Sequence, residues 1–373
     1  MKTGLSLTEL ATEIERRANA KRDMVVSTEN LRMEVADQPA HAEAGVTGNA
    51  LVVANRETYG ANTVAHRQIA EYADIPAKYY DRMRMEAPRL LADNVNTWFA
   101  KKPAPRMVRT LDGTARAFLS DRYRPLENEE LAEAVLPALL DLDVEIMSAQ
   151  ITETRLYIKA VHRSIRKDMP VEAKGAGWGD GSHHIFRTQS PGIVISNSEV
   201  GYGALSVETS VFDRVCTNLA IFSQHSMKKY HTGAKQGLLT DDIMHLLSDE
   251  TRRLTDKAVW AQVGDIVRGA FDEAKFNARV DEIAGLQDVK LEGDPVKVVE
   301  LAARRFGLNQ GEQTSILRHL IEGAALTGYG LYNAVTRTGQ DQDDYDRATT
   351  FEKLGGKLLD LAKEDWRELA KAA

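Results

Sequence analysis

The sequence predicts an α+β protein with a central, mostly antiparallel sheet, flanking N-terminal helices and a helical C-terminal region. Helical patterns come first, a strand-rich block follows over about residues 106–233, and helical patterns return after Thr232. Within the block, Leu111-Asp112-Gly113 separates two strand-like segments, and Asp-Gly is a strong signal for a two-residue hairpin turn. Strands that do not alternate with helices favour an antiparallel arrangement over βαβ units.

We expect three segments along the chain: an N-terminal helix and linker over 1–50, an α+β core over 51–238, and a helical region over 239–373 that packs on the core. Residues 5–21 have the apolar spacing of a short amphipathic helix. Residues 36–50 are rich in Ala, Gly and polar side chains, which is typical of a linker.

Between the linker and the hairpin, the pattern predicts a strand at 51–55 and helices over 63–73, 76–87 and 88–99. Pro76 suits the first position of a helix, where its missing N–H costs nothing. The first two helices are spaced like a helix-turn-helix, and the second would carry Lys78, Arg82 and Arg84 toward phosphates. The alternative is ordinary helix packing, because many pairs of short helices share this spacing.

After the hairpin, Asn128 is expected to cap a helix with one apolar face. A second hairpin is predicted over 144–161, with its turn near Thr152–Thr154, and strands are predicted at 192–198 and 202–212. The C-terminal helices are expected over 239–260, 265–285, 294–306, 312–325 and 350–370.

Composition is that of a globular chain. Of the 373 residues, 43% are hydrophobic and 28% charged, enough to build a sizeable core. The single cysteine, Cys216, excludes a disulfide framework and a Cys-based zinc site, and it suits a reducing compartment. No apolar run resembles a signal peptide or reaches the length of a membrane span. We therefore expect a cytoplasmic protein with no membrane association.

The net charge of −7 is unevenly placed. Residues 241–373 carry all of it, whereas residues 151–240 sum to +4. Such asymmetry permits a basic surface on an acidic protein, although a modest excess of Lys and Arg is commonly a solvated face.

Several segments match one family. They are HRQIAEYADIPAKYYDRM (66–83), LSDRYRPLENEEL (119–131), GIVISNSEVGYGALSVETSVFDRVCTNLAIF (192–222), YHTG (230–233) and GYGLYNAVTRTGQDQDDYDRATTFEKLGGKLL (328–359). In these segments the chain resembles the DUF932 family of phage- and plasmid-borne proteins, from about residue 60 onward. The resemblance implies no established reaction. It implies a mobile-element setting: a phage, prophage or plasmid.

The segment SDRYRP is one candidate contact for nucleic acid. If it is extended, Arg122 and Arg124 lie on one face and Tyr123 on the other. Arginines paired on one face suit phosphate contacts. The alternative is that both arginines brace the sheet by pairing with nearby glutamates.

A second candidate is the basic set of the second hairpin. Arg155 and Lys159 share a strand face at a period of two, and Arg163 follows. With nearby aromatic residues such as Tyr123, they would line a groove that follows a single strand and stacks its bases. The alternative is ordinary solvated charge.

A third pattern concerns metal binding. The candidate ligands are Asp180, His183, Glu199 and His231. Clusters of Asp and His bind divalent metals, and Glu199 also suits an acid/base role. The alternatives are a Gly-rich surface loop over 177–184 and, at Glu199, a tight turn in which Gly201 and Gly203 permit close backbone approach.

Together these patterns predict a non-enzymatic protein that binds nucleic acid, with single-stranded DNA favoured. It would act as a single-strand-binding or annealing protein in recombination, form a homo-oligomer and need no cofactor, since no GxGxxG or Walker-type loop is present. One alternative is a metal-dependent hydrolase or nuclease. Another is a protein-binding module that inhibits a host factor through the acidic segment QDQDDYDR (340–347).

Overall fold

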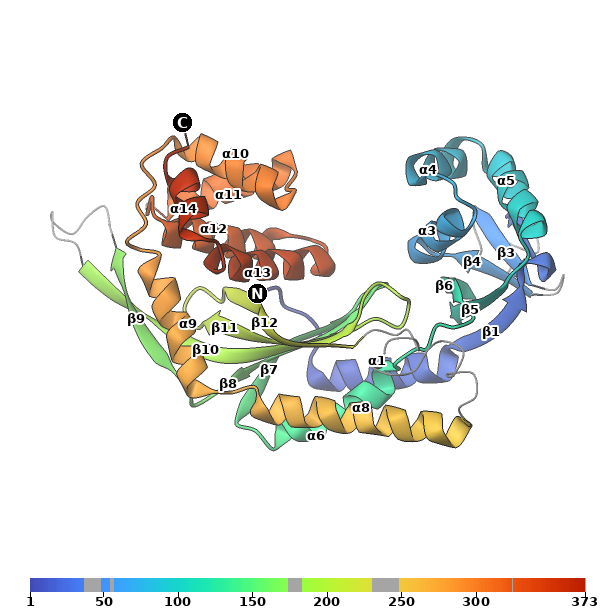
Figure 1. The fold of residues 1–373 in the computed structure, drawn as a ribbon, viewed down its shortest axis with the longest axis horizontal. Coiled ribbons are helices and arrows are strands. Elements are labelled where there is room, and N and C mark those ends of the chain that lie inside the picture. The colour runs from blue at the N-terminus through green and yellow to red at the C-terminus, as the bar shows by residue number, and fades with distance from the viewer. Residues whose placement is uncertain (37–47, 54–56, 174–182, 230–247, 324, 373) are drawn as a thin grey trace.

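The computed structural model describes residues 1–36, 48–53, 57–173, 183–229, 248–323 and 325–372. Within them the chain forms two six-stranded, mostly antiparallel sheets together with helices, which confirms the α+β class (Figure 1). The strand patterns therefore belong to two sheets, where one central sheet was expected. No described helix is both long enough and apolar enough to cross a membrane.

The first sheet has the order β1-β5-β6-β4-β3-β2. Its strands are β1 (Arg22–Ser27), β2 (Leu31–Val35), β3 (Asn49–Val53), β4 (Glu57–Ala61), β5 (Pro105–Leu111) and β6 (Thr114–Ser120). The helices α3 (Thr63–Tyr72), α4 (Ala77–Glu86) and α5 (Pro88–Lys101) pack on it over a core that includes Ile69, Phe99 and Phe118. We call this sheet with α3–α5 the first lobe.

In the first lobe, local sequence signals identified the hairpin and the helices but not β1, β2 or β4. The Asp-Gly hairpin is confirmed: Asp112 and Gly113 have φ values of 49° and 74°, as a type I′ turn requires. The three predicted helices are α3, α4 and α5. The α+β core was predicted to begin at residue 51. It begins earlier, because β1 and β2 already belong to the first sheet.

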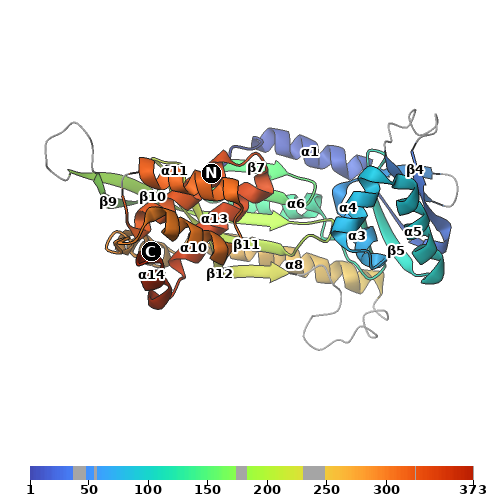
Figure 2. The ribbon, with the colours of Figure 1, turned by 90° about the horizontal axis from the view of Figure 1, so that it is seen from above.

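The second sheet has the order β12-β11-β10-β8-β7. Its strands are β7 (Val144–Ile151), β8 (Leu156–His162), β9 (Lys167–Ala173), β10 (His183–Asn197), β11 (Leu205–Asp213) and β12 (Leu219–Lys229). The long strand β10 pairs with β9 along its first half and with β8 along its second. Figure 2 shows that these strands run along the long axis, with the first lobe at one end.

Helices cover both faces of the second sheet (Figure 1). On one face lie α1 (Leu7–Ala20), α6 (Asn128–Leu140) and α8 (Asp249–Gly269), which share an apolar core with it. The C-terminal helices α9 (Glu273–Gly285), α10 (Pro295–Phe306), α11 (Gln310–Glu322), α12 (Gly328–Asp341), α13 (Tyr345–Leu359) and α14 (Lys363–Ala370) form a second core, which includes Phe222 and Phe351. These helices bury side chains that the strand pattern alone predicted to be exposed to solvent.

Several helix boundaries differ from the predictions. The break expected between residues 260 and 265 lies inside α8, and Pro76 is the N-cap of α4, where the first helical position was expected. The helix expected over 350–370 is two helices, α13 and α14. The cap of α6 is Glu127, and Asn128 is the first helical residue. Asn128 has another role, because its side chain accepts a hydrogen bond from Asn197 and its backbone N–H donates to Glu199.

Candidate functional site

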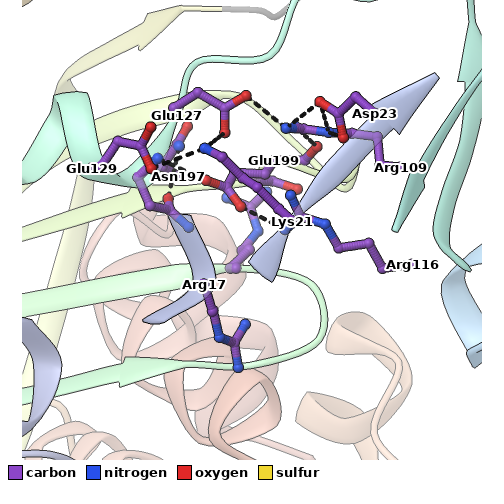
Figure 3. A network of polar contacts seen from close by, with 12 residues as sticks. Arg17, Lys21, Asp23, Arg109, Arg116, Glu127, Glu129, Asn197 and Glu199 are labelled. Atoms are coloured by element: carbon purple, nitrogen blue, oxygen red, sulfur yellow. Dashed lines mark hydrogen bonds and ion pairs between the residues drawn. The ribbon is translucent and has the colours of Figure 1, made fainter. Parts of the chain in front are cut away.

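A network of charged side chains joins the two sheets (Figure 3). Arg109 of β5 and Arg116 of β6 both reach Glu199, which follows β10. The Arg116 Nη1 atom lies 2.6 Å from Glu199 Oε2, and Arg109 Nη1 donates to the Glu199 carbonyl at 2.7 Å. The first hairpin is thereby bound to the end of the longest strand of the other sheet.

Arg109 is fully buried and uses every nitrogen of its guanidinium group. Its Nε donates to Asp23 at 3.0 Å and its Nη2 donates to Glu127 at 2.6 Å, in addition to the Glu199 carbonyl. Lys21 Nζ adds ion pairs to Glu127 and Glu129 at 2.9 Å. A buried cation is tolerated when carboxylates and hydrogen bonds compensate it in this way.

The two glutamates of the network differ in their proton affinity. Burial disfavours the charged form of both. At Glu199, Arg116 and the Asn128 backbone N–H outweigh burial and lower the pKa, whereas at Glu127 burial and the charge of Glu199 outweigh Arg109 and raise the pKa. Glu199 is therefore held as a carboxylate opposite Arg116.

A cavity of about 310 Å³ adjoins this network. Its lining includes Arg17 of α1, Arg116 and Glu199, together with Arg155 and Asn62. Among the described residues, the Nε and Nη2 atoms of Arg116 have no hydrogen-bond partner, although Arg116 is only 7% exposed.

Lys159, predicted to face nucleic acid, is buried. It is 1% exposed, its Nζ lies 2.5 Å from Glu352 Oε2, and it donates to Thr349 Oγ1 at 3.0 Å. Both partners belong to α13, which covers this face of the second sheet. The prediction of an exposed face shared by Arg155 and Lys159 is therefore wrong at Lys159.

Arg155 supports the turn between β10 and β11. Its guanidinium donates to the carbonyls of Tyr202 at 2.7 Å and Ala204 at 3.4 Å. Gly203, at φ 141°, leaves room for it, because a Cβ there would overlap the guanidinium group. The close approach expected at this glycine is confirmed.

The SDRYRP segment forms a turn after β6, so its residues do not alternate on a strand. The Tyr123 hydroxyl donates to the Ser198 carbonyl at 3.1 Å and accepts from the Gly201 N–H at 3.2 Å. Tyr123 thus fastens this turn to the one after β10, while Arg122 is exposed and Arg124 is half-buried.

The three basic residues predicted on the second hairpin, Arg155, Lys159 and Arg163, do not form one surface. Arg163 is exposed just beyond the end of β8, and Arg155 lies just before its start. At about 3.3 Å per residue, the intervening strand holds these two positions roughly 25 Å apart. With Lys159 buried between them, no continuous basic groove follows this strand.

The predicted metal ligands are also separated. His183 begins β10, and Glu199 lies beyond its other end, so a fifteen-residue strand of about 50 Å separates them. Asp180, His231 and the His183 side chain lie outside the described residues. Within the described ranges, no group of three or more His, Cys, Asp or Glu side chains is placed to hold a metal ion.

The acidic segment 340–347 is tied into the fold. Asp341 accepts from Arg318 at 2.7 Å, Asp344 caps α13 by accepting from the Arg347 N–H, and Asp346 accepts from Thr152 at 3.1 Å. These contacts favour a structural role for its aspartates over the binding of a partner.

The solvent face of α3–α5 carries exposed cations, among them Lys78 and Arg82, which the helix-turn-helix spacing predicted as phosphate contacts. Residues 63–101, which contain α3–α5, have six Lys and Arg against five Asp and Glu, in a chain with a net charge of −7. On α4, Lys78 and Arg82 are exposed and Tyr79 is 47% exposed, while Tyr80 points into the core. Arg67 of α3 is exposed as well.

No family model matches the chain, and neither does any curated protein or solved structure. The resemblance to the DUF932 family therefore stays a prediction.

Proposed function

We propose that the protein binds nucleic acid, with single-stranded DNA favoured, through the solvent face of α3–α5. The observation that carries the proposal is the exposed ring of Tyr79 with the exposed cations Lys78 and Arg82 on the same helix, α4, where Arg82 also pairs with the exposed Glu86 at 2.8 Å. Cations that neutralise phosphates release bound counterions and so drive association. Local potential governs this approach, so an acidic chain as a whole does not prevent it.

Exposed apolar side chains beside the cations favour an unpaired strand. Tyr79 is 47% exposed, Met85 is 74% exposed, and Leu90 at the start of α5 is 50% exposed. A base stacks on an aromatic ring such as Tyr79 only when the base is unpaired, and this stacking contributes about 1–3 kcal/mol per base. The setting in a mobile element rests on the resemblance to phage and plasmid proteins.

The position of α4 also suits phosphate contacts. Lys78 and Tyr79 lie in its first turn, where the backbone N–H groups carry partial positive charge. The buried side of the helix is held by Tyr80, whose hydroxyl lies 2.9 Å from Nδ1 of His66 on α3. This contact holds one side of α4 against α3, so Lys78 and Arg82 on the opposite side face the solvent.

The test is fluorescence anisotropy with a labelled single-stranded oligonucleotide and the matching duplex, at 50 mM salt and across a salt series. We expect the single strand to bind more tightly and its affinity to fall as salt rises. Lys78→Glu with Arg82→Glu should weaken binding at least tenfold.

A matched control reverses two cations on the C-terminal helices, Lys297→Glu with Arg367→Glu, both exposed. It changes the net charge equally and should leave binding within about twofold. Absence of binding at 50 mM salt, affinity independent of salt, or equal loss in both double variants would refute the proposal. A preference for duplex would replace the single strand with helix-turn-helix recognition.

A further inference from the structure

We propose that the cavity at the junction of the two sheets binds a small ligand through an oxyanion, a phosphate or a carboxylate group, gripped by Arg116. The cavity is separate from the face of α3–α5, and the inference does not depend on the proposed function. It rests on the hydrogen bonds of one buried side chain and on the lining of the cavity.

Arg116 has an open edge. Its Nη1 is bound to Glu199 at 2.6 Å, while its Nε and Nη2 have no partner within the part of the chain that the structure describes. The N–H groups of Nε and Nη2 point the same way from one edge of the planar guanidinium, and this fork matches the two oxygens of a carboxylate or phosphate. The atoms left without partners are thus the pair that binds an oxyanion in bidentate fashion.

Arg109, the neighbour of Arg116, shows that protein groups at the junction can pair every nitrogen of a buried guanidinium without a ligand. Each of its three nitrogens donates, to Asp23, to Glu127 and to the Glu199 carbonyl. Buried side-chain donors are nearly always paired, so an unpaired fork on a residue that is 7% exposed calls for a partner.

The cavity supplies space and further donors. Its volume of about 310 Å³ lies at the lower end of the range for small-molecule sites. Thr114 contributes a hydroxyl to the lining, whereas the hydroxyl of Thr152, also in the lining, already donates to Asp346. Arg155 also lines it and forms no ion pair within the part of the chain that is described, so its charge is not cancelled by a carboxylate.

Carboxylates are present as well, and they limit the size of the anion. Glu199 faces Arg116 and is neutralised by it, and the exposed Glu153 lies in the lining. Arg17 is paired with Glu13 at 2.6 Å. The remaining excess of donors suits one oxyanion on a compact molecule and disfavours a polyanion.

The test is isothermal titration calorimetry of the full chain with sodium phosphate and, separately, with sodium acetate, at ionic strength held constant with chloride. We expect saturable one-site binding of at least one anion. Phosphate alone would assign a phosphate ligand, and acetate alone a carboxylate ligand. Arg116→Lys keeps the cation opposite Glu199 but removes the fork, and it should weaken binding at least tenfold.

Thr114→Val tests the same cavity without touching the Glu199 ion pair, and a loss of about threefold or more is expected. Arg163→Lys, exposed at the far end of β8, is the control and should bind as the unchanged chain does. The proposal is overturned by the absence of saturable binding of either anion, or by unchanged affinity in Arg116→Lys. If Arg116→Lys fails to fold, unchanged affinity in Thr114→Val overturns it. Lys78→Glu with Arg82→Glu should retain anion binding, which separates this outcome from failure of the nucleic-acid proposal.

Discussion

At the scale of residues, the buried ion pair of Lys159 and Glu352 shows why a strand pattern misjudges a charge. Each side chain is 1% exposed, and the two residues are 193 positions apart in the chain. The period-two pattern around Lys159 correctly predicted that this residue lies in a strand, β8. It carried no information about which helix covers that strand, because the partner lies in a distant segment.

The pair makes a testable contribution to stability. Removing one partner leaves an uncompensated buried charge, so Lys159→Met should lower the free energy of unfolding by about 3–5 kcal/mol. The double variant Lys159→Met with Glu352→Leu should recover most of that loss, since it removes both charges. Urea unfolding measures both. A double variant as unstable as the single one would contradict this account.

His66 predicts a dependence of stability on pH. Burial lowers its pKa from 6.5 to about 4. Between these values the unfolded chain takes up a proton that the folded chain does not, so acid favours unfolding. The share of stability linked to His66, about 3 kcal/mol, is intact above pH 6.5 and is lost as pH falls toward 4.

Urea unfolding at pH 7 and pH 4.5, with His66→Gln as the comparison, measures this share. The difference in unfolding free energy between the two pH values should be smaller in His66→Gln than in the unchanged chain. If the difference were equal in both proteins, His66 would take up its proton in the folded chain as readily as in the unfolded chain, which would contradict the account.

At the scale of elements, local chemistry predicted hairpins and helices, but not their partners. The Asp-Gly turn between β5 and β6 and the Pro76 signal before α4 depend on backbone geometry, which the sequence encodes directly. The strand β1 was missed because it is an edge strand with half-exposed residues and weak alternation. Edge strands lack the apolar pattern that burial on both sides imposes.

The helix α13 contains an adjacent pair of glycines, Gly355 and Gly356, which helix propensity disfavours. A Cβ at Gly356 would overlap the Ile221 carbonyl of β12, so the helix lies directly on the strand backbone. Gly356→Ala should therefore lower the free energy of unfolding by about 1–3 kcal/mol, although propensity alone predicts a gain of about 1 kcal/mol.

Gly285, the last residue of α9, provides the control, because a Cβ there would meet no atom of the described residues within 4 Å. Gly285→Ala should be neutral or slightly stabilising in the same urea unfolding experiment. Stabilisation by both substitutions would show that α13 has room to move away from β12.

At the scale of the whole molecule, the junction between the sheets was beyond prediction from sequence. Arg116 and Arg109 are 83 and 90 positions from Glu199. The prediction of Glu199 as an acid/base or metal ligand identified a residue in the charged network. It did not identify the partners that hold Glu199 as a structural carboxylate. The division of the strands into two sheets could not be predicted either, because one sheet and two sheets give the same pattern of strands along the sequence.

The junction should be a main source of stability for the assembled molecule. Arg109→Met leaves Asp23 and Glu127 without their shared cation, so it should lower the free energy of unfolding by about 3–5 kcal/mol. The exposed Arg163→Met should change it by less than about 0.5 kcal/mol. Similar effects of the two substitutions in urea unfolding would show that the network contributes little.

The central claim, that nucleic acid binds on the face of α3–α5, is tested most directly by ultraviolet cross-linking to a single-stranded oligonucleotide followed by peptide mass spectrometry. Our account predicts cross-links within 77–90, with Tyr79 the principal site, and their loss in Lys78→Glu with Arg82→Glu. Cross-links confined to the second sheet or the C-terminal helices, or no cross-links at 50 mM salt, would contradict it.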